Sequence, residues 1–239
     1  MVKRRVTSFL VPCKVEDFND GDTFPETPKF SGELPESFGK VNSLALFKAS
    51  NNHFISEFPQ WIGKITSLEY LELSNNQFTG SIPQSIGEPT SLTYLSISNN
   101  KLVGNVPLSL SSCTRLSVIR LRGNGFNRTI PEGLFGLRSK EIDVSHNGLL
   151  GSVPAGSEKL IVLNLRNSAL YGSVPADIYD SGNLEVLQLD GNSLKGSIPD
   201  EIRNCTSLYL LRMLVSYVFV RIVSVLVEAK QAQNPETGV

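Results

Sequence analysis

Apolar residues recur along this chain with a fixed period of 24 residues. Over residues 68–86, leucines at 68, 71 and 73 are followed by Asn76, Phe78, Gly80 and the pair Ile82-Pro83. The same pattern opens at Leu92, one period later, and at Leu44, one period earlier. Polar side chains alternate with the leucines, and this alternation predicts a short strand with one buried face. After each strand we expect a turn at the Asn and the Gly, and then a return of the Ile to the core.

A period of this length with the spacing Leu-x-x-Leu-x-Leu-x-x-Asn is typical of a leucine-rich repeat solenoid. We predict an α/β-type solenoid, a horseshoe with a parallel sheet on its concave side and short 3-10 turns and loops on its convex side. One coil cannot bury its apolar side alone, so neighbouring coils must stack. The third leucine of each repeat should be fully buried, as at Leu121, Leu165 and Leu189. The repeat Asn should bond backbone groups that the curve leaves without strand partners.

The repeat divides the chain into three parts. Residues 1–29 form a divergent N-terminal segment, residues 30–213 carry the repeats, and residues 214–239 form an aberrant apolar tail. The repeat region is predicted to hold half a repeat, seven full repeats and a partial eighth. The fifth full repeat is short, at 21 residues. The full repeats open at Leu44, Leu68, Leu92, Leu116, Ser139, Leu160 and Leu184.

Both ends of the chain depart from the repeat. The N-terminal MVKRR is basic, but the apolar run at residues 6–11 is too short for a convincing secretion signal, which favours a divergent or truncated start. Near the other end, residues 208–227 are largely apolar and long enough to span a membrane. Arg212 and Arg221 oppose insertion by about 2.5–3.5 kcal/mol each when central in a span. The many Val and Ile residues there favour strand, so a capping or aberrant tail is preferred to a membrane helix.

Composition and motifs exclude several functions. Charged residues make up 19% of the chain and the net charge is −1, which does not suit a nucleic-acid partner. Neither His-Arg-Asp nor Asp-Phe-Gly occurs, so the chain carries no kinase motif. The two histidines, His53 and His146, lie beside the repeat Asn on predicted surface turns. We therefore expect no enzyme activity, no cofactor and no metal site.

The three cysteines do not suggest a disulfide framework. Cys113 and Cys205 each stand three residues before a repeat-opening leucine, in an inward-facing position. They lie four coils apart, at roughly 4.8 Å per coil, which exceeds the reach of a disulfide. Both are interpreted as buried small hydrophobes, and Cys13 has no visible partner.

Two sequence motifs match the acceptor of N-linked glycosylation. They are Asn127-Arg128-Thr129 and Asn204-Cys205-Thr206. Both asparagines are predicted to face outward, which agrees with a secreted surface. Chance occurrence is the alternative, because such short motifs are common.

The outward residues of the strands are the candidate binding surface, since solenoids of this kind bind partners on their concave side. Tyrosine and arginine are frequent anchors of protein interfaces. The alternative is that these are ordinary strand residues on a solvated face. The candidate ligand-binding residues are Tyr70, Glu72, Tyr94, Arg120, Arg122, Asp143 and Arg166.

The complete motif, Leu-x-x-Leu-x-Leu-x-x-Asn-x-Leu-x-Gly-x-Ile-Pro, resembles the plant-type leucine-rich repeats of receptor-like kinases, receptor-like proteins and polygalacturonase inhibitors. The resemblance covers residues 30–213. The run from Asn164 to Leu211 is most similar to a branch of receptor-like kinases regarded as inactive kinases. It implies a piece of an extracellular sensing domain at the plasma membrane, with a peptide or a partner protein such as a co-receptor as ligand. The signal peptide, cysteine-paired cap, membrane helix and kinase of such receptors are not securely present here.

Arg120 and Arg122 flank Leu121 on one predicted strand and point to the same face. They resemble the arginine pair with which several plant peptide-hormone receptors hold the terminal carboxylate of a peptide. The alternative is that they form ion pairs with Glu141 and Asp143 on the adjacent strand.

Three functions stay open on the sequence. The first is a ligand-binding fragment of a receptor-like kinase. The second is a secreted inhibitor of a cell-wall-degrading enzyme, built on the same repeats. The third is a truncated product without a ligand, which the incomplete ends favour.

Overall fold

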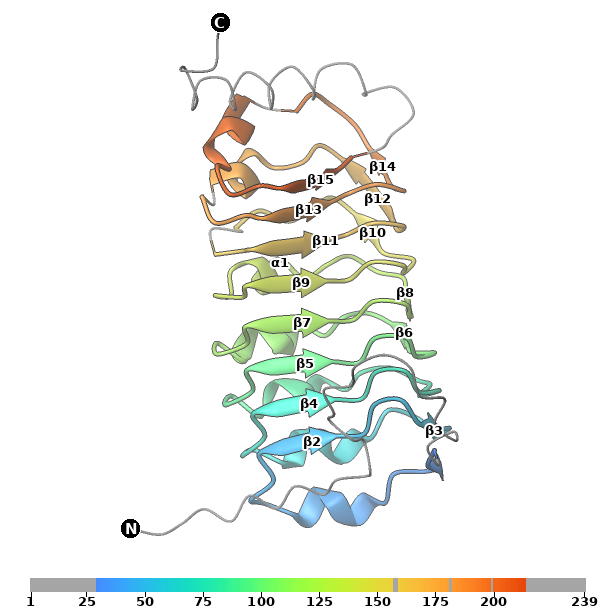
Figure 1. The fold of residues 1–239 in the computed structure, drawn as a ribbon. Coiled ribbons are helices and arrows are strands. Elements are labelled where there is room, and N and C mark those ends of the chain that lie inside the picture. The colour runs from blue at the N-terminus through green and yellow to red at the C-terminus, as the bar shows by residue number, and fades with distance from the viewer. Residues whose placement is uncertain (1–28, 157–158, 181, 199, 214–239) are drawn as a thin grey trace, which may run out of the picture.

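The computed structural model describes residues 29–156, 159–180, 182–198 and 200–213. Over these residues the chain winds into coils that stack in chain order, from the blue end to the orange-red end of Figure 1. The predicted solenoid of parallel strands with short 3-10 turns is confirmed. The predicted division into an N-terminal segment (1–29), a repeat region (30–213) and a tail (214–239) stays a prediction, because residues 1–28 and 214–239 lie outside the described part of the chain.

One face of the solenoid is an eight-stranded parallel sheet whose strand order follows the chain. Equivalent residues of successive coils pair in register, as Leu46 does with Tyr70 and Tyr70 with Tyr94. Glu141 pairs with Val162, so the shortened fifth repeat keeps its place in the sheet. The strands are β2 (Leu46–Lys48), β4 (Tyr70–Glu72), β5 (Tyr94–Ser96), β7 (Val118–Arg120), β9 (Glu141–Asp143), β11 (Val162–Asn164), β13 (Val186–Gln188) and β15 (Leu210–Arg212).

A second set of short strands lies along one side of the solenoid, at the right-hand edge of Figure 1. The sequence analysis did not predict it. These strands form the parallel sheets β1-β3, β6-β8 and β10-β12-β14. Glycines with positive φ, such as Gly104 and Gly151, stand in or next to them and turn the chain toward the next helix. The strands are β1 (Ser31–Gly32), β3 (His53–Phe54), β6 (Val103–Gly104), β8 (Gly125–Phe126), β10 (Leu150–Gly151), β12 (Ala169–Gly172) and β14 (Ser193–Leu194).

Short helices connect the side strands back to the main sheet. A proline directly precedes η1, η2, η3, η4 and α1. Its missing N–H costs little there, because the first amides of a helix have no partner inside the helix. The 3-10 helices are η1 (Glu36–Lys40), η2 (Gln60–Lys64), η3 (Gln84–Gly87), η4 (Leu108–Ser112), η5 (Ala176–Asp180) and η6 (Asp200–Asn204), and α1 (Glu132–Phe135) is α-helical.

The core runs the length of the stack. Leu121 and Leu165 are 0% exposed and Leu189 is 1% exposed, so their predicted burial is confirmed. At the N-terminal end, the buried Trp61 ring lies 5.7 Å from Phe38 and 5.9 Å from Phe47, measured between ring centroids. The core is therefore continuous from leucine-rich coils to an aromatic first coil.

Cys113 and Cys205 are buried and free, as predicted. The Cys113 thiol lies 3.5 Å from the carbonyl oxygen of Pro89, and the Cys205 thiol 3.2 Å from that of Tyr179. Burial raises the pKa of each thiol to about 11. Both side chains therefore stay protonated and behave as small apolar groups.

The repeat asparagines join adjacent coils, as predicted. Asn76 accepts a hydrogen bond from the Phe54 amide at 3.2 Å and donates to the carbonyls of Ala49 at 2.8 Å and Leu73 at 3.1 Å. Ser168 interrupts the series, and within the described part of the chain its buried hydroxyl has no hydrogen-bond partner. Equivalent bonds are made by Asn52, Asn100, Asn124, Asn147 and Asn192.

Of the apolar stretch 208–227, residues 210–212 form strand β15 and residues 214–227 lie outside the described part of the chain. Where the structure describes the chain, no helix has the length and apolar character needed to cross a membrane. Cys13 also lies outside the described residues.

Candidate ligand-binding face

The solvent side of the eight-stranded sheet, here called the sheet face, carries most of the predicted site residues. The middle residue of a strand points into the core, as Leu71, Leu95 and Ile119 do. Most flanking residues are partly exposed, although Ser96, Asn164 and Val186 are buried. Parallel pairing in register then places equivalent side chains of neighbouring coils side by side. The alternation of strand side chains is therefore enough to bring this set onto one surface.

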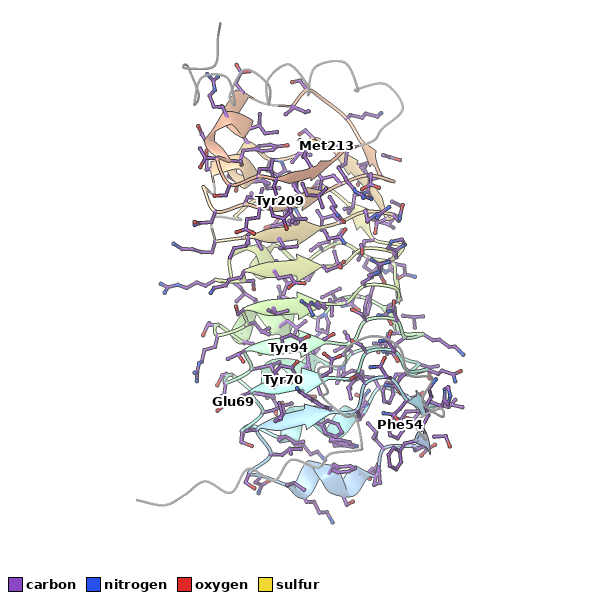
Figure 2. The ribbon with its side chains drawn as sticks, in the orientation of Figure 1. Phe54, Glu69, Tyr70, Tyr94, Tyr209 and Met213 are labelled. Atoms are coloured by element: carbon purple, nitrogen blue, oxygen red, sulfur yellow. The ribbon has the colours of Figure 1, made fainter. Side chains whose placement is uncertain are left out.

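Tyr70 and Tyr94 form an aromatic stack on the sheet face (Figure 2). Their ring centroids are 4.1 Å apart and their planes differ by 4°. The Lys48 ammonium lies 4.8 Å from the Tyr70 ring, and the Arg120 guanidinium carbon lies 5.7 Å from the Tyr94 ring. The two tyrosine rings thus lie between Lys48 and Arg120, and the four side chains come from four adjacent strands. Each cation–π contact contributes about 0.5–1 kcal/mol at such a partly exposed position.

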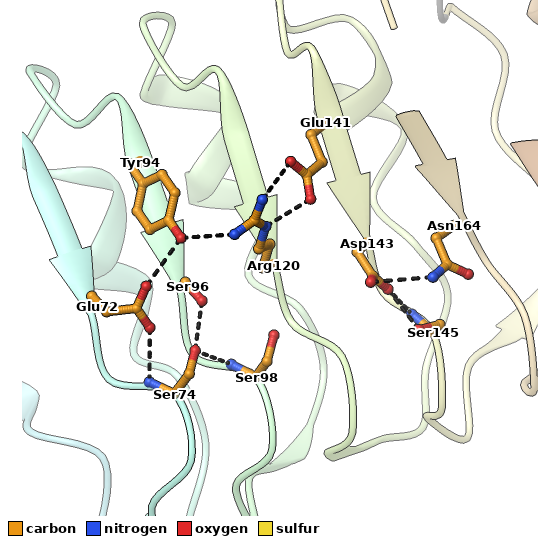
Figure 3. A network of polar contacts seen from close by, with 10 residues as sticks. All are labelled: Glu72, Ser74, Tyr94, Ser96, Ser98, Arg120, Glu141, Asp143, Ser145 and Asn164. Carbon is orange, nitrogen blue, oxygen red and sulfur yellow. Dashed lines mark hydrogen bonds and ion pairs between the residues drawn. The ribbon is translucent and has the colours of Figure 1, made fainter. Parts of the chain in front are cut away.

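Arg120 is the centre of a polar network (Figure 3). Its Nε and Nη2 donate to the two carboxylate oxygens of Glu141 at 2.6 and 2.8 Å, and its Nη1 donates to the Tyr94 hydroxyl at 3.1 Å. That hydroxyl donates in turn to Glu72 at 3.0 Å. Hydrogen bonding to Glu141 raises the pKa of Arg120, and burial together with Tyr94 raises the pKa of Tyr70. The cation and the phenol therefore keep their protons at neutral pH.

A shallow hollow of about 320 Å³ lies beside this network and is here called the serine hollow. The hydroxyls of Ser74 and Ser96 are 2.5 Å apart, and Ser74 Oγ accepts from the Ser98 amide at 3.1 Å. Small side chains thus leave room on the sheet face where longer ones stand elsewhere. The hollow is lined by Ser50, Asn51, Glu72, Ser74, Asn75, Ser96, Ser98, Asn99 and Arg120.

An asparagine ladder borders the serine hollow, and the sequence analysis missed it. Asn99 Nδ2 donates to Asn75 Oδ1 at 2.7 Å, and Asn75 Nδ2 donates to Asn51 Oδ1 at 2.8 Å. All three residues have positive φ, as do His146 and Asn167 at the equivalent positions of later coils. Asn tolerates this left-handed backbone better than most residues. The residue type before the repeat Asn was therefore a signal that could have revealed the ladder.

Arg122, Asp143 and Arg166 take different roles from those of the network. Arg122 is exposed, and no carboxylate of the described residues lies within ion-pair distance of it. Asp143 instead accepts from the Ser145 amide and hydroxyl and from Asn164 Nδ2, and Arg166 pairs with Asp190 at 3.1 Å. The alternative, that the two arginines form ion pairs with acids of the adjacent strand, is thus confirmed for Arg120 with Glu141. It is wrong for Arg122 with Asp143, because Ser145 and Asn164 hold that carboxylate.

His146 lies at a bend, as predicted, whereas His53 is the first residue of strand β3, so the predicted turn is wrong for His53. His53 is exposed, and the His146 ring contacts Asn167 Nδ2, with 3.2 Å between that nitrogen and Nε2. Burial and the positive charges of Arg122 and Arg166 lower the pKa of His146. The imidazole is therefore neutral at pH 7 and adds no charge to the face.

The remaining predicted sites concern modification and metal binding. Asn127 and Asn204 are both exposed, as the acceptor motifs require. No group of three His, Cys, Asp or Glu residues in the described ranges is arranged to hold a metal ion.

Comparison with protein-family models identifies leucine-rich repeats in two parts of the chain, residues 40–102 and residues 183–205. Comparison with curated protein sequences finds no match. Together with the stacked parallel strands, the family models define the fold as that of a leucine-rich repeat protein.

Solved structures of plant receptors share this fold. The ectodomain of the receptor kinase GASSHO1/SCHENGEN3 from Arabidopsis thaliana, in complex with CASPARIAN STRIP INTEGRITY FACTOR 2, is 32% identical over 77% of this chain and 23% of that one, with a TM-score of 0.75. The peptide hormone receptor RGFR1 in complex with RGF2 is 36% identical over 75% and 30% of the two chains, with a TM-score of 0.74. The Arabidopsis receptor kinase HAESA, in complex with the peptide hormone IDA and the co-receptor SERK1, is 36% identical over 77% and 31%, also with a TM-score of 0.74.

The chain is thus structurally similar to the extracellular domains of plant leucine-rich repeat receptor kinases. It spans between about a quarter and a third of the length of these three chains. The described residues correspond to an ectodomain-like fold and contain no kinase domain.

Proposed function

We propose that this chain is a ligand-binding leucine-rich repeat module, part of the extracellular domain of a plant receptor-like kinase, and that it binds a peptide on its sheet face. The single observation that carries the proposal is the exposed guanidinium of Arg122, which has no carboxylate partner among the described residues. The similar receptor structures, solved with peptide hormones, support the same kind of ligand.

The position of Arg122 defines how such a peptide would lie. Ser50, Ser74 and Ser98 hold equivalent places in three successive coils, and Arg122 holds that place in the next coil. A floor of small side chains therefore ends at an unneutralised cation. An extended peptide that crosses the strands over the serine hollow would bring its terminal carboxylate to Arg122, where a guanidinium can bind it bidentately.

Arg120 has a supporting part in this proposal. Its Nε and Nη2 are held by Glu141, and its Nη1 by Tyr94. A ligand carboxylate that displaced Glu141 would leave that acid without its partner, which opposes the exchange. Arg120 therefore holds Glu72 at the wall of the hollow through the Tyr94 hydroxyl, while Arg122 receives the anion. Asp143 and Arg166 continue the polar surface beyond it.

The parent receptor belongs to the same proposal. By resemblance of the run 164–211, we assign it to the branch of receptor-like kinases regarded as inactive kinases, with a co-receptor as protein partner. It would be a glycoprotein of the plasma membrane. The intact transcript tests this part, since continuation past Val239 into a membrane helix and a kinase-type domain is expected.

The binding test uses the full chain and a random peptide library with free carboxyl termini. Selected peptides should lose roughly 10- to 100-fold in affinity when amidated, because a hydrogen-bonded charge contributes about 1.5–3 kcal/mol. Arg122→Gln should cause a similar loss, and the exposed Arg138→Gln is the matched control. For peptides selected on the wild type, the Arg122→Gln variant should bind the free-acid and the amidated forms with equal affinity. Unchanged affinity of that variant for the acids would refute the assignment.

The two alternative functions, an enzyme inhibitor and a product without a ligand, predict different results with the same protein preparation. An inhibitor of a wall-degrading enzyme would slow polygalacturonase without any added peptide. A product without a ligand would enrich no peptide from the library.

A further inference from the structure

One side of the solenoid carries a row of exposed apolar side chains. Among the described residues seven large hydrophobic side chains are exposed, and four of them lie in this row: Ile55 at 58%, Val103 at 50%, Leu150 at 45% and Tyr171 at 57%. Each directly follows the buried Phe or Leu of its repeat and belongs to or adjoins a side strand. We call the row the lateral column; it comprises Ile55, Thr79, Val103, Asn127, Leu150, Tyr171 and Lys195.

Backbone hydrogen bonds hold together the segments that carry the lateral column. The Asn127 amide donates to Gly104 O at 3.0 Å, one residue after Val103, and the Leu150 amide donates to Arg128 O at 3.1 Å. Val103 lies opposite Gly125 and Leu150 lies opposite Thr129. Asn127 stands midway between these two partner residues, on the chain that lies between Val103 and Leu150. An exposed apolar array of this kind is a site of association unless something covers it.

Asn127 stands in the middle of this row and opens the acceptor motif Asn127-Arg128-Thr129. Its amide N–H is used by the neighbouring coil, and within the described residues no hydrogen bond engages its side chain. Thr129 is also exposed, and it forms an isolated parallel bridge with Leu150. The chain bends at Arg128, between Asn127 and Thr129, and both side chains are exposed, so the Asn amide and the Thr hydroxyl are both accessible.

We propose that Asn127 carries an N-linked glycan that covers the lateral column and prevents self-association there, while the sheet face stays open to ligand. This inference rests on the proposed function, which places the chain in the secretory pathway. Asn127 Nδ2 bonds to the anomeric carbon of a lipid-linked oligosaccharide, the bond from that carbon to the pyrophosphate oxygen breaks, the lipid pyrophosphate leaves and the amide loses one proton. Figure 1 places the side strands away from the front of the main sheet, so the glycan would not cover the serine hollow.

The first experiment measures occupancy on the full chain, secreted from plant cells behind a secretion signal. Peptide mass mapping before and after glycosidase treatment should find the glycan on Asn127 in the wild type. Thr129→Ser keeps the acceptor motif and should keep the glycan, whereas Thr129→Ala should lose it. An unmodified Asn127 in the secreted wild type overturns the proposal.

The second experiment measures association by sedimentation over a range of concentrations. The Thr129→Ala chain should associate more strongly than the wild type, and Asn204→Gln should not. Val103→Ser with Leu150→Ser, added to Thr129→Ala, should reverse the increase. No increase in Thr129→Ala overturns the covering role, and so does an increase that the two serines leave unchanged. Peptide binding through Arg122 in the same preparations tests the proposed function separately.

Discussion

Replacing Ser168 by Asn should stabilise the fold, because Ser168 is a gap in an otherwise regular set of bonds between coils. In the other coils the repeat Asn accepts from an amide of the preceding coil, as Asn192 does from Leu170 at 3.1 Å. The equivalent amide below Ser168 belongs to Leu149, a residue that is 0% exposed. No acceptor within the described residues bonds to it, and the Ser168 hydroxyl is itself without a partner.

The size of the effect follows from the bonds that Asn makes elsewhere. Asn192 Nδ2 donates to Leu165 O at 2.8 Å and to Leu189 O at 2.9 Å in addition to the bond that its Oδ1 accepts. Leaving a buried amide unpaired costs about 1–3 kcal/mol, and each further net hydrogen bond contributes about 0.5–1.5 kcal/mol. Ordering the Asn side chain offsets part of this gain. We expect Ser168→Asn to raise the free energy of unfolding by about 1–3 kcal/mol.

Urea denaturation followed by circular dichroism measures the change, and Asn124→Ser is the matched reverse substitution. Asn124 accepts from the Leu102 amide and donates to Ile97 O and Leu121 O. Serine can replace few of these bonds, so Asn124→Ser should cost about 2–4 kcal/mol. The reasoning would be refuted if Asn124→Ser lowers the urea midpoint and Ser168→Asn leaves it unchanged or lowers it. An asparagine at position 168 would then not form the hydrogen bonds that the repeat asparagines form in the other coils.

Three other predictions concern single positions. Leu121→Ala should lower the free energy of unfolding by about 2–5 kcal/mol, since it removes a fully buried side chain, and a denaturation midpoint equal to that of the wild type would contradict the assigned register. The lowered pKa of His146 means that the unfolded chain binds more protons below about pH 6.5, so this contribution to stability is present at pH 7 and is lost as the pH falls. His146→Asn should therefore flatten the acid side of a plot of melting temperature against pH, and an identical acid side in both chains argues against it. Cys113 and Cys205, with pKa values of about 11, should resist alkylation at pH 8 in the folded chain and react in urea, as peptide mass mapping would show; labelling without urea would mean that these positions are open.

The repeat could be predicted from the sequence because it is specified by the spacing of apolar residues and by their alternation with polar ones. Leu71 and Leu95 could be placed in the core from spacing alone, and the outward position of Tyr70 and Tyr94 followed from alternation. The side strands were missed for a physical reason. They are two to four residues long, they include glycines such as Gly104 and Gly151, and their pairing depends on the stacking of coils rather than on a pattern inside one coil.

The polar contacts of the sheet face were only partly predictable. The register places Arg120 opposite Asp143 and Glu141 opposite Val118, so spacing alone does not show which of the two acids Arg120 binds. The structure distinguishes the two acids: Ser145 and Asn164 donate to Asp143, while Glu141 accepts hydrogen bonds from Nε and Nη2 of Arg120. Side-chain competition of this kind depends on rotamers, which a repeat pattern does not encode.

The aromatic first coil has an optical consequence. Trp61 is the one tryptophan of the chain, and it packs against Phe38 and Phe47 at the N-terminal end of the stack. In a solenoid each coil contacts only its neighbours, so unfolding can start at an end and spread. Tryptophan emission therefore reports on the end coil, whereas circular dichroism reports on all coils together. A difference between the two melting curves would measure the fraying of that end, several coils away from Arg122.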